Sequence, residues 1–156
     1  MFVGLMMHCI RTDSTHADFK KLVTELDAEL RIRDGDESEF YEQFNKSDSI
    51  KYAVVIYQNG VAVGCGALRP YTEDTIEVKR MYVPLEHRSK GIASLVVTEL
   101  EKWAIELGFY HLILETGIRQ PEAIRLYTKN GYQSIPKYGQ YEGVSSSVCF
   151  AKQLAK

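Results

Sequence analysis

The sequence lacks the features that mark membrane, metal-bound and nucleic-acid-binding proteins. It has no apolar run near the roughly 20 residues that a membrane-spanning helix needs, and no cysteine pair at zinc-ligand spacing. Its formal net charge is only −2, so no global field would attract nucleic acid. There is no low-complexity or Pro/Gly/Ser-rich stretch to serve as a linker. We therefore expect one domain over residues 1–156, with its core at about 7–154.

Cysteine and histidine are sparse and scattered. Cys9, Cys65 and Cys149 lie far apart in expected strands, so we predict no metal site, and buried reduced thiols are typical of a cytoplasmic protein. The opening segment 1–7 is apolar but lacks the basic residues and the long apolar run of a secretory signal. We interpret this segment as an extension ahead of the true start of the protein and expect a cytoplasmic location.

Strand and helix patterns alternate along the chain, which predicts a mixed α/β domain. The expected elements are a strand at 7–11, a helix capped by Ser14 or Thr15, a short helix at 37–45, strands at 51–57, 61–68 and 75–83, a helix at 91–107, a strand at 112–115, a helix at 121–130, and strands at 132–135 and 147–151. The pair Asn59-Gly60 is typical of a two-residue type I′ turn, so its flanking strands should be antiparallel neighbours.

The expected strand at 75–83 has irregular spacing. Its apolar residues follow one another at intervals of two, three and two: Ile76, Val78, Met81 and Val83. A regular strand alternates with a period of two. One extra residue around Lys79-Arg80 therefore predicts a β-bulge, which would bend the strand and leave a backbone polar group free for a ligand. A simple twist with an exposed Lys-Arg pair is the alternative.

A basic, glycine-bearing turn follows this strand and opens the next helix. It reads Arg88-Ser89-Lys90-Gly91-Ile92-Ala93. The first N–H groups of a helix lack intrahelical acceptors and lie at the positive end of the helix dipole, while glycine removes the Cβ that would block close approach. Proteins hold phosphate and pyrophosphate in this way, so we predict a phosphorylated cofactor here. The P-loop and Rossmann fingerprints are both absent from the sequence.

Three segments in order resemble the GNAT superfamily of N-acetyltransferases, over nearly the whole span 7–154. They are 78–93, in which Arg88-x-x-Gly91-x-Ala93 fits the family's pyrophosphate loop, then 112–117, and then 123–132, which looks like the helix and strand that close the family's coenzyme A cleft. The resemblance implies an α/β (α+β) fold with a mixed, mostly antiparallel twisted sheet of about seven strands, flanked by about four helices. It also implies acetyl-CoA as the donor, an amine as the acceptor and no metal.

The resemblance further implies which residues hold the coenzyme. The pyrophosphate would lie on the turn formed by Arg88, Ser89, Lys90, Gly91, Ile92 and Ala93, and the pantetheine arm would pair with the strand edge at Met81, Tyr82 and Val83. Many relatives carry an asparagine just before the second helix of the cleft, where this chain reads Gln120-Pro121-Glu122-Ala123. Gln120 is the candidate substitute. His87, just before the turn, is expected to be a surface residue.

Acetyl transfer to an amine needs a base for the amine proton and an acid for the departing thiolate. Glu77 is the first candidate for the base and Glu115 the second, although Glu77 could instead be an exposed residue paired with Lys79. Tyr127 stands where many relatives carry a tyrosine that reaches the CoA sulfur. A phenol with an ordinary pKa of about 10 stays protonated at neutral pH. Simple packing in the core is the structural alternative for Tyr127.

The acceptor is less clearly encoded. In the family the first two helices, the fourth strand and the last hairpin line its pocket, and here these parts offer aromatic and acidic residues: Glu37, Glu39, Phe40, Tyr41, Tyr138, Gly139 and Tyr141. This lining favours the primary amine of a small or amino-acid-like molecule, although the tyrosines could only order a surface loop. The alternatives are a peptide or protein N-terminus, and coenzyme binding without turnover. The final strand could pair across a homodimer.

Overall fold

The computed structural model describes residues 6–44 and 49–155. Its elements are β1 (Met7–Thr12), α1 (Ala17–Asp34), α2 (Ser38–Glu42), β2 (Tyr52–Gln58), β3 (Val61–Pro70), β4 (Thr75–Tyr82), α3 (Ile92–Glu106), β5 (His111–Gly117), α4 (Pro121–Lys129), β6 (Gln133–Ile135) and β7 (Ser147–Gln153), with 3-10 turns at Gly35–Glu37, Leu85–His87 and Gly139–Tyr141. The short helix expected at 37–45 is α2, which begins one residue later and ends at Glu42. Residue 45 of that prediction lies outside the described residues, and so do residues 1–5 of the expected N-terminal extension.

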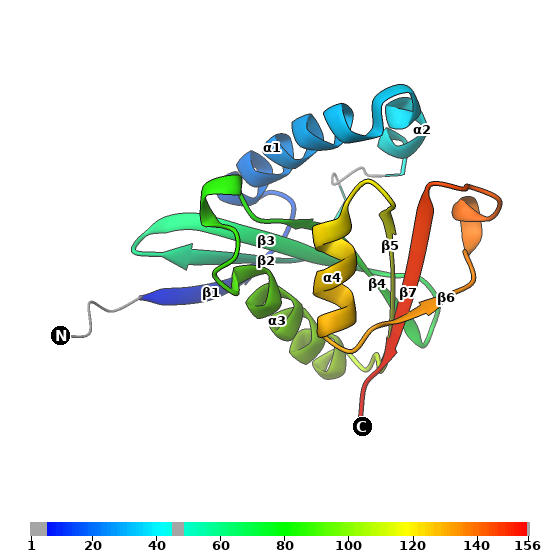
Figure 1. Cartoon of the computed structure of the whole chain (residues 1–156). Coiled ribbons are helices and arrows are strands. Elements are labelled where there is room, and N and C mark those ends of the chain that lie inside the picture. The colour runs from blue at the N-terminus through cyan, green and yellow to red at the C-terminus, as the bar shows by residue number, and fades with distance from the viewer. Residues whose placement is uncertain (1–5, 45–48, 156) are drawn as a thin grey trace.

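The strands form one seven-stranded sheet in the order β1-β2-β3-β4-β5-β7-β6 (Figure 1). Only β4 and β5 run parallel, and the other neighbours are antiparallel. The expected mixed, mostly antiparallel sheet is confirmed. The expectation that the final strand is a free edge is wrong, because β7 pairs along its whole length with β5 and carries β6 on its other side. The predicted homodimer thus loses the edge on which it rested and stays a prediction.

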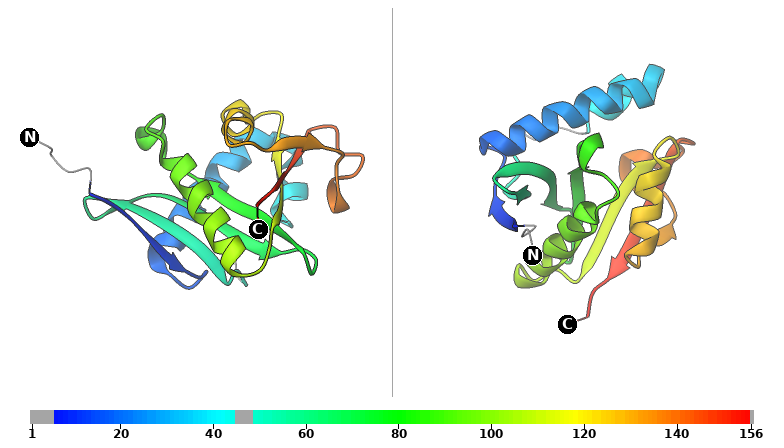
Figure 2. Two further views of the ribbon diagram at one scale, coloured as in Figure 1. Left: turned by 90° about the horizontal axis from the view of Figure 1, so that it is seen from below. Right: turned by 60° about the vertical axis from the view of Figure 1, so that its left-hand side comes forward.

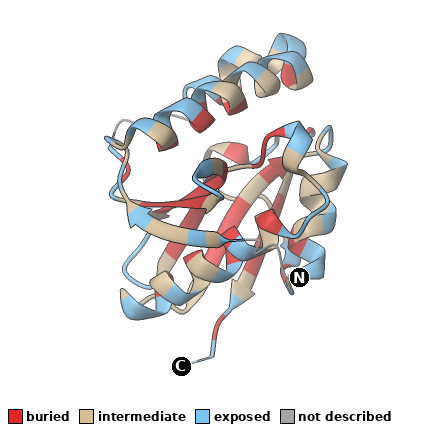
Figure 3. Ribbon diagram, turned by 90° about the vertical axis from the view of Figure 1, so that its left-hand side faces the viewer, coloured by how far each residue is buried: buried red, intermediate tan, exposed pale blue. Residues whose placement is uncertain are grey.

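Two layers of helix cover the sheet. The larger apolar core lies under α3 and α4 and includes Val54, Leu68, Ile76, Leu100 and Leu112. A smaller core lies on the opposite face under α1, around Phe19, Leu22 and Val55. The two further views in Figure 2 separate these layers, and Figure 3 shows buried residues along the strands and on the inner side of α1. Each face is thus closed by helices from a different part of the chain.

The predicted turn and the predicted bulge are both present. Asn59 and Gly60 have φ of 50° and 82°, as a type I′ turn requires, and they join the antiparallel pair β2 and β3. In the β3–β4 ladder Cys65 pairs with Tyr82 but Ala67 pairs with Lys79, so one residue of β3 faces two of β4. Arg80 occupies the bulge with φ of 58°. The irregular apolar spacing of β4 is therefore a bulge and not a simple twist.

The start of α1 differs from the expected cap. His16 is the N-cap residue, and its Nδ1 accepts a hydrogen bond of 3.2 Å from the Asp18 N–H. Thr15 donates its hydroxyl to Asp13 instead, at 2.6 Å. The prediction of Ser14 or Thr15 as the cap is wrong because the helix starts one residue later than Thr15 would cap it, and the His16 ring nitrogen accepts from its first turn.

Two glycines of β3 let α3 lie close against the sheet. A Cβ at Gly66 would meet both the Met81 Sδ and the Val96 Cγ1 at 2.6 Å, and a Cβ at Gly64 would meet the Ile92 Cγ2 at 2.8 Å. These contacts are shorter than any side chain tolerates. The absent side chains therefore fix how near the first turns of α3 come to β3 and β4.

Candidate active site between β4 and β5

The parallel strands β4 and β5 pair only at one end. The ladder joins Thr75–Glu77 to His111–Ile113 and then stops, although both strands continue. A cavity of about 730 Å³ lies where they part. Its walls come from β4 (78–82), the following turn and the start of α3, the end of β5 (115–117), α4, and the inner side of α1. The parting of the two strands therefore coincides with a cleft that residues from several elements line.

Most of the predicted coenzyme residues line this cavity. They are Met81, Tyr82, Val83, Arg88, Ser89, Gly91, Ile92, Ala93 and Gln120. Lys90 is exposed and does not appear among the described residues of the wall. The turn, the strand edge and the start of α4 are thus brought together from three separate parts of the chain.

The turn before α3 has the geometry of an anion site. Ser89 and Gly91 have φ of 65° and 80°, so the chain reverses sharply there. Gly91 is the N-cap, and the Leu95 N–H donates to its carbonyl at 3.1 Å. The N–H groups of Ile92, Ala93 and Ser94 consequently precede the first N–H group that has an intrahelical acceptor, and they can donate to a ligand. They belong to a helix of 15 residues whose positive end lies at the cavity.

Arg88 is held against α1 and the strand edge. Its Nε donates to the Val83 carbonyl at 2.7 Å, its Nη2 donates to the Glu29 Oε1 at 2.7 Å, and its guanidinium lies 5.8 Å from the centre of the Tyr82 ring. The guanidinium charge is therefore already balanced by a carboxylate. The backbone N–H groups of the turn, and not this side chain, are the better placed donors for an incoming anion.

His87 is not the plain surface residue that the sequence suggested. It lines the cavity, and its Nδ1 is buried without a hydrogen-bond partner. The 3-10 turn Leu85–His87 folds its ring inward, with the His87 N–H donating to the Pro84 carbonyl at 2.9 Å. A buried nitrogen without a partner at the wall of an anion site is a candidate ligand contact.

Glu115 is a partly buried carboxyl group on the cavity wall, which Glu29, Asp34 and Glu122 also line. It lies near the end of β5 and lines the cavity. Burial raises its pKa to about 7, against a smaller opposing effect of the hydrogen bond with Ser147 and of the Lys79 charge. A carboxyl group with this pKa is partly ionised at neutral pH, as a general base requires. The sequence named this residue only second, because burial at the end of a strand leaves no local pattern.

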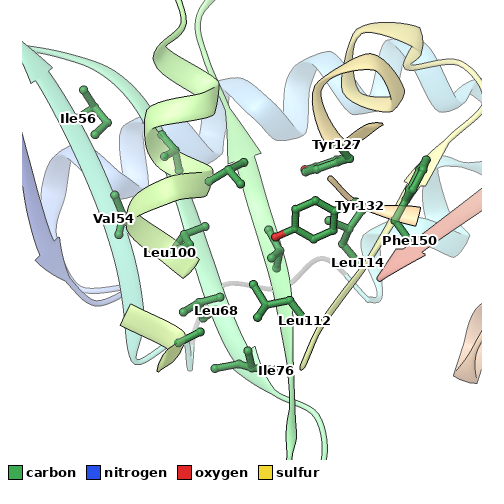
Figure 4. Close-up of a cluster of buried hydrophobic side chains, with 14 of the residues drawn as sticks. Val54, Ile56, Leu68, Ile76, Leu100, Leu112, Leu114, Tyr127, Tyr132 and Phe150 are labelled. Atoms are coloured by element: carbon green, nitrogen blue, oxygen red, sulfur yellow. The ribbon is translucent and has the colours of Figure 1, made fainter. Parts of the chain in front are cut away.

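Tyr127 projects from α4 into the same cavity. Its side chain is buried and packs beside Tyr132 and Phe150, with ring centres 5.7 and 6.1 Å away (Figure 4). Burial raises the pKa of Tyr127, and the nearby Glu115 charge adds to the effect. The phenol therefore stays protonated throughout the neutral range. Its position is both part of the core and part of the cavity wall.

Glu77 lies deeper than expected. It is 5% exposed, and one of its carboxylate oxygens accepts a hydrogen bond of 2.6 Å from the Tyr138 hydroxyl. The alternative of an exposed Glu77 is therefore wrong. Glu77 does not appear among the described residues of the cavity wall. Burial together with the Glu77 charge raises the pKa of Tyr138, so this hydrogen bond keeps its proton on the phenol.

Of the residues expected around the acceptor, Tyr41 and Tyr141 line the cavity. Tyr41 shares hydrogen bonds with the hydroxyls of Ser146 and Ser147 at 2.6 and 3.1 Å. Two aromatic neighbours extend this pair, since Phe40 packs on Tyr41 and Tyr138 lies edge-on to Tyr141. Gly139 lies beside the Tyr71 hydroxyl, Glu37 is paired with Arg119, and Glu39 is exposed. The tyrosines therefore form a buried wall and not only a surface loop.

Neither a helix that could span a membrane nor a metal-binding group is found among the described residues, and both findings hold for these residues alone. Across residues 6–44 and 49–155 no helix is both long and apolar enough to cross a membrane. Within the same residues no group of three or more histidine, cysteine or acidic side chains could hold a metal ion. The three cysteines are free, with Cys65 and Cys149 buried and Cys9 partly exposed.

Comparison with known proteins identifies the class. The model of the acetyltransferase (GNAT) family matches residues 19–132, and the chain belongs to this family. Its sheet order and its flanking helices are those of the GNAT fold, as a crystal structure from Klebsiella pneumoniae subsp. pneumoniae MGH 78578 shows. That protein, assigned as an acyl-CoA N-acyltransferase, is 33% identical, superposes with a TM-score of 0.81, and matches over 97% of this chain and 100% of its own.

Individual relatives are similar over part of the sequence. The IAA acetyltransferase of Azospirillum brasilense is 37% identical over 102 residues, which cover 65% of this chain and 67% of that protein. The uncharacterised N-acetyltransferase YjgM of Escherichia coli (strain K12) is 33% identical over 107 residues, or 67% of this chain and 63% of that protein. The chain thus spans about two thirds of the length of these relatives.

Proposed function

We propose that the chain transfers an acetyl group from acetyl-CoA to the primary amine of a small or amino-acid-like molecule. One observation carries the proposal. A single cavity is lined by an anion-holding turn, by a carboxyl group with a pKa of about 7 and by a buried protonated tyrosine. These are the three groups that acetyl transfer to an amine needs, and the chain belongs to a family of acetyltransferases.

The coenzyme would lie along the cleft, with its pyrophosphate on the N–H groups of the turn at 89–93 and its pantetheine beside Met81–Val83 and Gln120. The Val83 carbonyl accepts from Arg88, so pairing of the pantetheine with this carbonyl would compete with one of the two hydrogen bonds of that guanidinium, while the one to Glu29 could remain. A GNAT acetyltransferase from Elizabethkingia anophelis has acetyl-CoA bound, and with 16% identity and a TM-score of 0.69 it is similar in fold alone.

The chemical step would be direct attack. Glu115 takes a proton from the acceptor ammonium, directly or through water, and the neutral nitrogen attacks the thioester carbonyl carbon. The C–N bond forms as the C–S bond breaks, and Tyr127 donates its proton to the departing sulfur. The nitrogen gives its second proton to water, and the Tyr127 phenolate regains a proton from water. Glu77, the first candidate on sequence, is engaged by Tyr138, so we assign the base to Glu115 and keep Glu77 as the second candidate.

The size and lining of the cavity favour a small acceptor. About 730 Å³ must hold the thioester end of the coenzyme together with the acceptor, which is within the usual range of small-molecule sites. Tyr41, Tyr141 and the acidic side chains at this end suit an organic ammonium group. A peptide N-terminus would need an open path between α2 and the 3-10 turn Gly139–Tyr141, where Tyr41 and Tyr141 are buried.

Two measurements test the function together. Saturating acetyl-CoA, at about 100 times its Kd, should add roughly 2.7 kcal/mol to the stability, which is a rise of a few degrees in Tm, while ATP and NAD should not. A panel of amines should then release CoA thiol only when acceptor is present, and Tyr127→Phe should slow this release by about 10²-fold.

Each alternative has its own outcome. A rise in Tm without thiol release from any amine would favour a coenzyme-binding module without turnover. Release with peptides but not with small amines would favour an N-terminal acetyltransferase. No rise with acetyl-CoA would overturn the proposal, because the turn would then not hold the coenzyme.

A further inference from the structure

Lys79 brings a primary amine of the chain itself into the proposed active site. It lies on β4 directly before the bulge at Arg80, is 8% exposed, and lines the cavity. Lysine is almost never buried to this extent unless it is paired. Its Nζ donates a hydrogen bond of 3.0 Å to the Phe44 carbonyl. The Phe44 ring lies edge-on to Tyr141, with ring centres 6.1 Å apart, and Tyr141 lines the cavity where the acceptor is expected.

The surroundings of Lys79 favour reactivity. Burial lowers its pKa, the charges of Glu77 and Glu115 work in the other direction, and those of Arg69 and Arg80 add to the lowering. A buried amine with a lowered pKa has a larger neutral fraction, and the neutral form is the nucleophile. Glu115, with its pKa of about 7, is a proton acceptor on the same cavity wall.

We propose that Lys79 is a self-acetylation site, whose Nζ takes the acetyl group when acetyl-CoA is bound and no acceptor fills the cleft. The inference rests on the proposed function. The neutral Nζ attacks the thioester carbonyl carbon, the N–C bond forms and the C–S bond breaks. Glu115 receives the proton that the nitrogen loses, and Tyr127 gives its proton to the sulfur, so the products are acetyl-lysine and CoA thiol. To attack, Nζ leaves the Phe44 carbonyl, to which it donates a hydrogen bond.

The modification would switch the enzyme off. Acetyl-lysine is an uncharged amide, so the carboxylates of Glu77 and Glu115 would lose their neighbouring positive charge, and the added acetyl group would occupy part of the acceptor space. Bound acceptor would prevent the reaction by separating Nζ from the thioester. The enzyme would then slow down when acetyl-CoA is present without acceptor.

The test compares two lysines of one chain. The full chain is incubated with saturating acetyl-CoA, and acetylation of each lysine is followed over time by peptide mass spectrometry. Lys79 should react about tenfold or more faster than exposed Lys90 on the turn, and faster than Lys79 in the urea-unfolded chain, because only the folded cleft aligns amine and thioester. Glu115→Gln should slow the reaction at Lys79 and leave the slow reaction at Lys90 unchanged.

Lys79→Arg supplies the matched control. Arginine keeps the positive charge and a donor for the Phe44 carbonyl but does not accept the acetyl group. The wild-type chain should lose activity during preincubation with acetyl-CoA, and the variant should keep whatever activity it starts with. If acetyl-CoA raises Tm but Lys79 reacts no faster than Lys90, the inference is overturned and the proposed function stands. If acetyl-CoA does not raise Tm, the proposed function fails first.

Discussion

A single residue, Glu115, sets the expected pH dependence of activity. Burial raises its pKa to about 7, and a base must be ionised before it accepts a proton. For the wild-type chain, kcat/KM should therefore rise with pH through about 7 and then level off. Glu115→Gln should lower kcat/KM by about 10²-fold or more and remove this rise. The measurement is kcat/KM as a function of pH, by thiol release.

The raised pKa of Glu115 should also make the free energy of unfolding depend on pH. This effect tests the pKa independently of any role that Glu115 has in catalysis. Because the native pKa lies above that of an ordinary glutamate, the native state holds the proton more tightly, and stability is lost as pH rises through about 7. Glu115→Gln does not titrate and avoids this loss. Its free energy of unfolding relative to the wild type should therefore increase by on the order of 2 kcal/mol between about pH 5 and pH 8. Exposed Glu86→Gln should show no such trend.

Gly66 is a second residue whose effect can be predicted from contacts. A methyl group there would lie 2.6 Å from both Met81 and Val96, so α3 or β4 would have to shift. Gly66→Ala should lower the free energy of unfolding by about 1–3 kcal/mol, measured by urea denaturation. Gly117→Ala is the control, because its nearest contacts are an ordinary 3.6 Å. Equal stability of the two variants would contradict the close-approach explanation.

At the scale of elements, the sequence predicted local features well. The type I′ turn at Asn59-Gly60, the bulge at Arg80 and the glycine that begins α3 all depend on a few adjacent residues, and all three are present. The cap of α1 was missed because it is His16, and histidine is not among the residue types that usually cap a helix. The place of β7 between β5 and β6 was missed because strand order depends on contacts between distant segments.

The candidate site divides in the same way. The coenzyme side follows a contiguous motif, so the turn at 88–93 and the edge at 81–83 could be predicted, and most of these residues line the cavity. The acceptor side is assembled from α1, α2, β4, β5 and the segment before β7. The choice between Glu77 and Glu115 depends on a hydrogen bond between Glu77 and Tyr138, 61 residues apart. No local pattern encodes such a contact.

The helix α1 is tied to both sides of the cleft by ion pairs. Glu29 pairs with Arg88 of the turn at 2.7 Å, and Arg33, which lies 3.7 Å from Glu29, pairs with Glu122 of α4. Because Glu29 neutralises Arg88, Glu29→Gln should free a positive charge for the pyrophosphate. The Kd of acetyl-CoA should fall by roughly threefold to tenfold at low salt, measured by calorimetry, with a smaller change at high salt.

The control for this change removes the same charge elsewhere. Glu42 pairs with Arg31 at 2.9 Å on an exposed part of α1 and α2, so Glu42→Gln should leave the Kd nearly unchanged. A Kd for Glu29→Gln that is equal to or weaker than that of the wild type would show that Arg88 positions α1 and does not reach the coenzyme.

At the scale of the whole molecule, the cleft divides the sheet into two parts, β1–β4 and β5–β7. They are joined by three residue pairs of the β4–β5 ladder, and α1 adds the ion pairs that cross the opening. A ligand in the cleft contacts both parts at once. Ligand binding should therefore reduce the local opening of backbone hydrogen bonds at the ends of β4 and β5. The same opening in the continuous ladder of β1 and β2 should be reduced less.

Hydrogen exchange with mass spectrometry measures this difference. At about 100 times its Kd, acetyl-CoA should slow exchange by roughly 10- to 100-fold in segments 80–93 and 114–117. Exchange in the β1–β2 ladder should change much less, because these strands do not line the cavity. ATP, which carries phosphates but no pantetheine, should leave segment 114–117 unprotected. Equal protection across the sheet would mean that the coenzyme stabilises the molecule as a whole and does not bridge the two parts at the cleft.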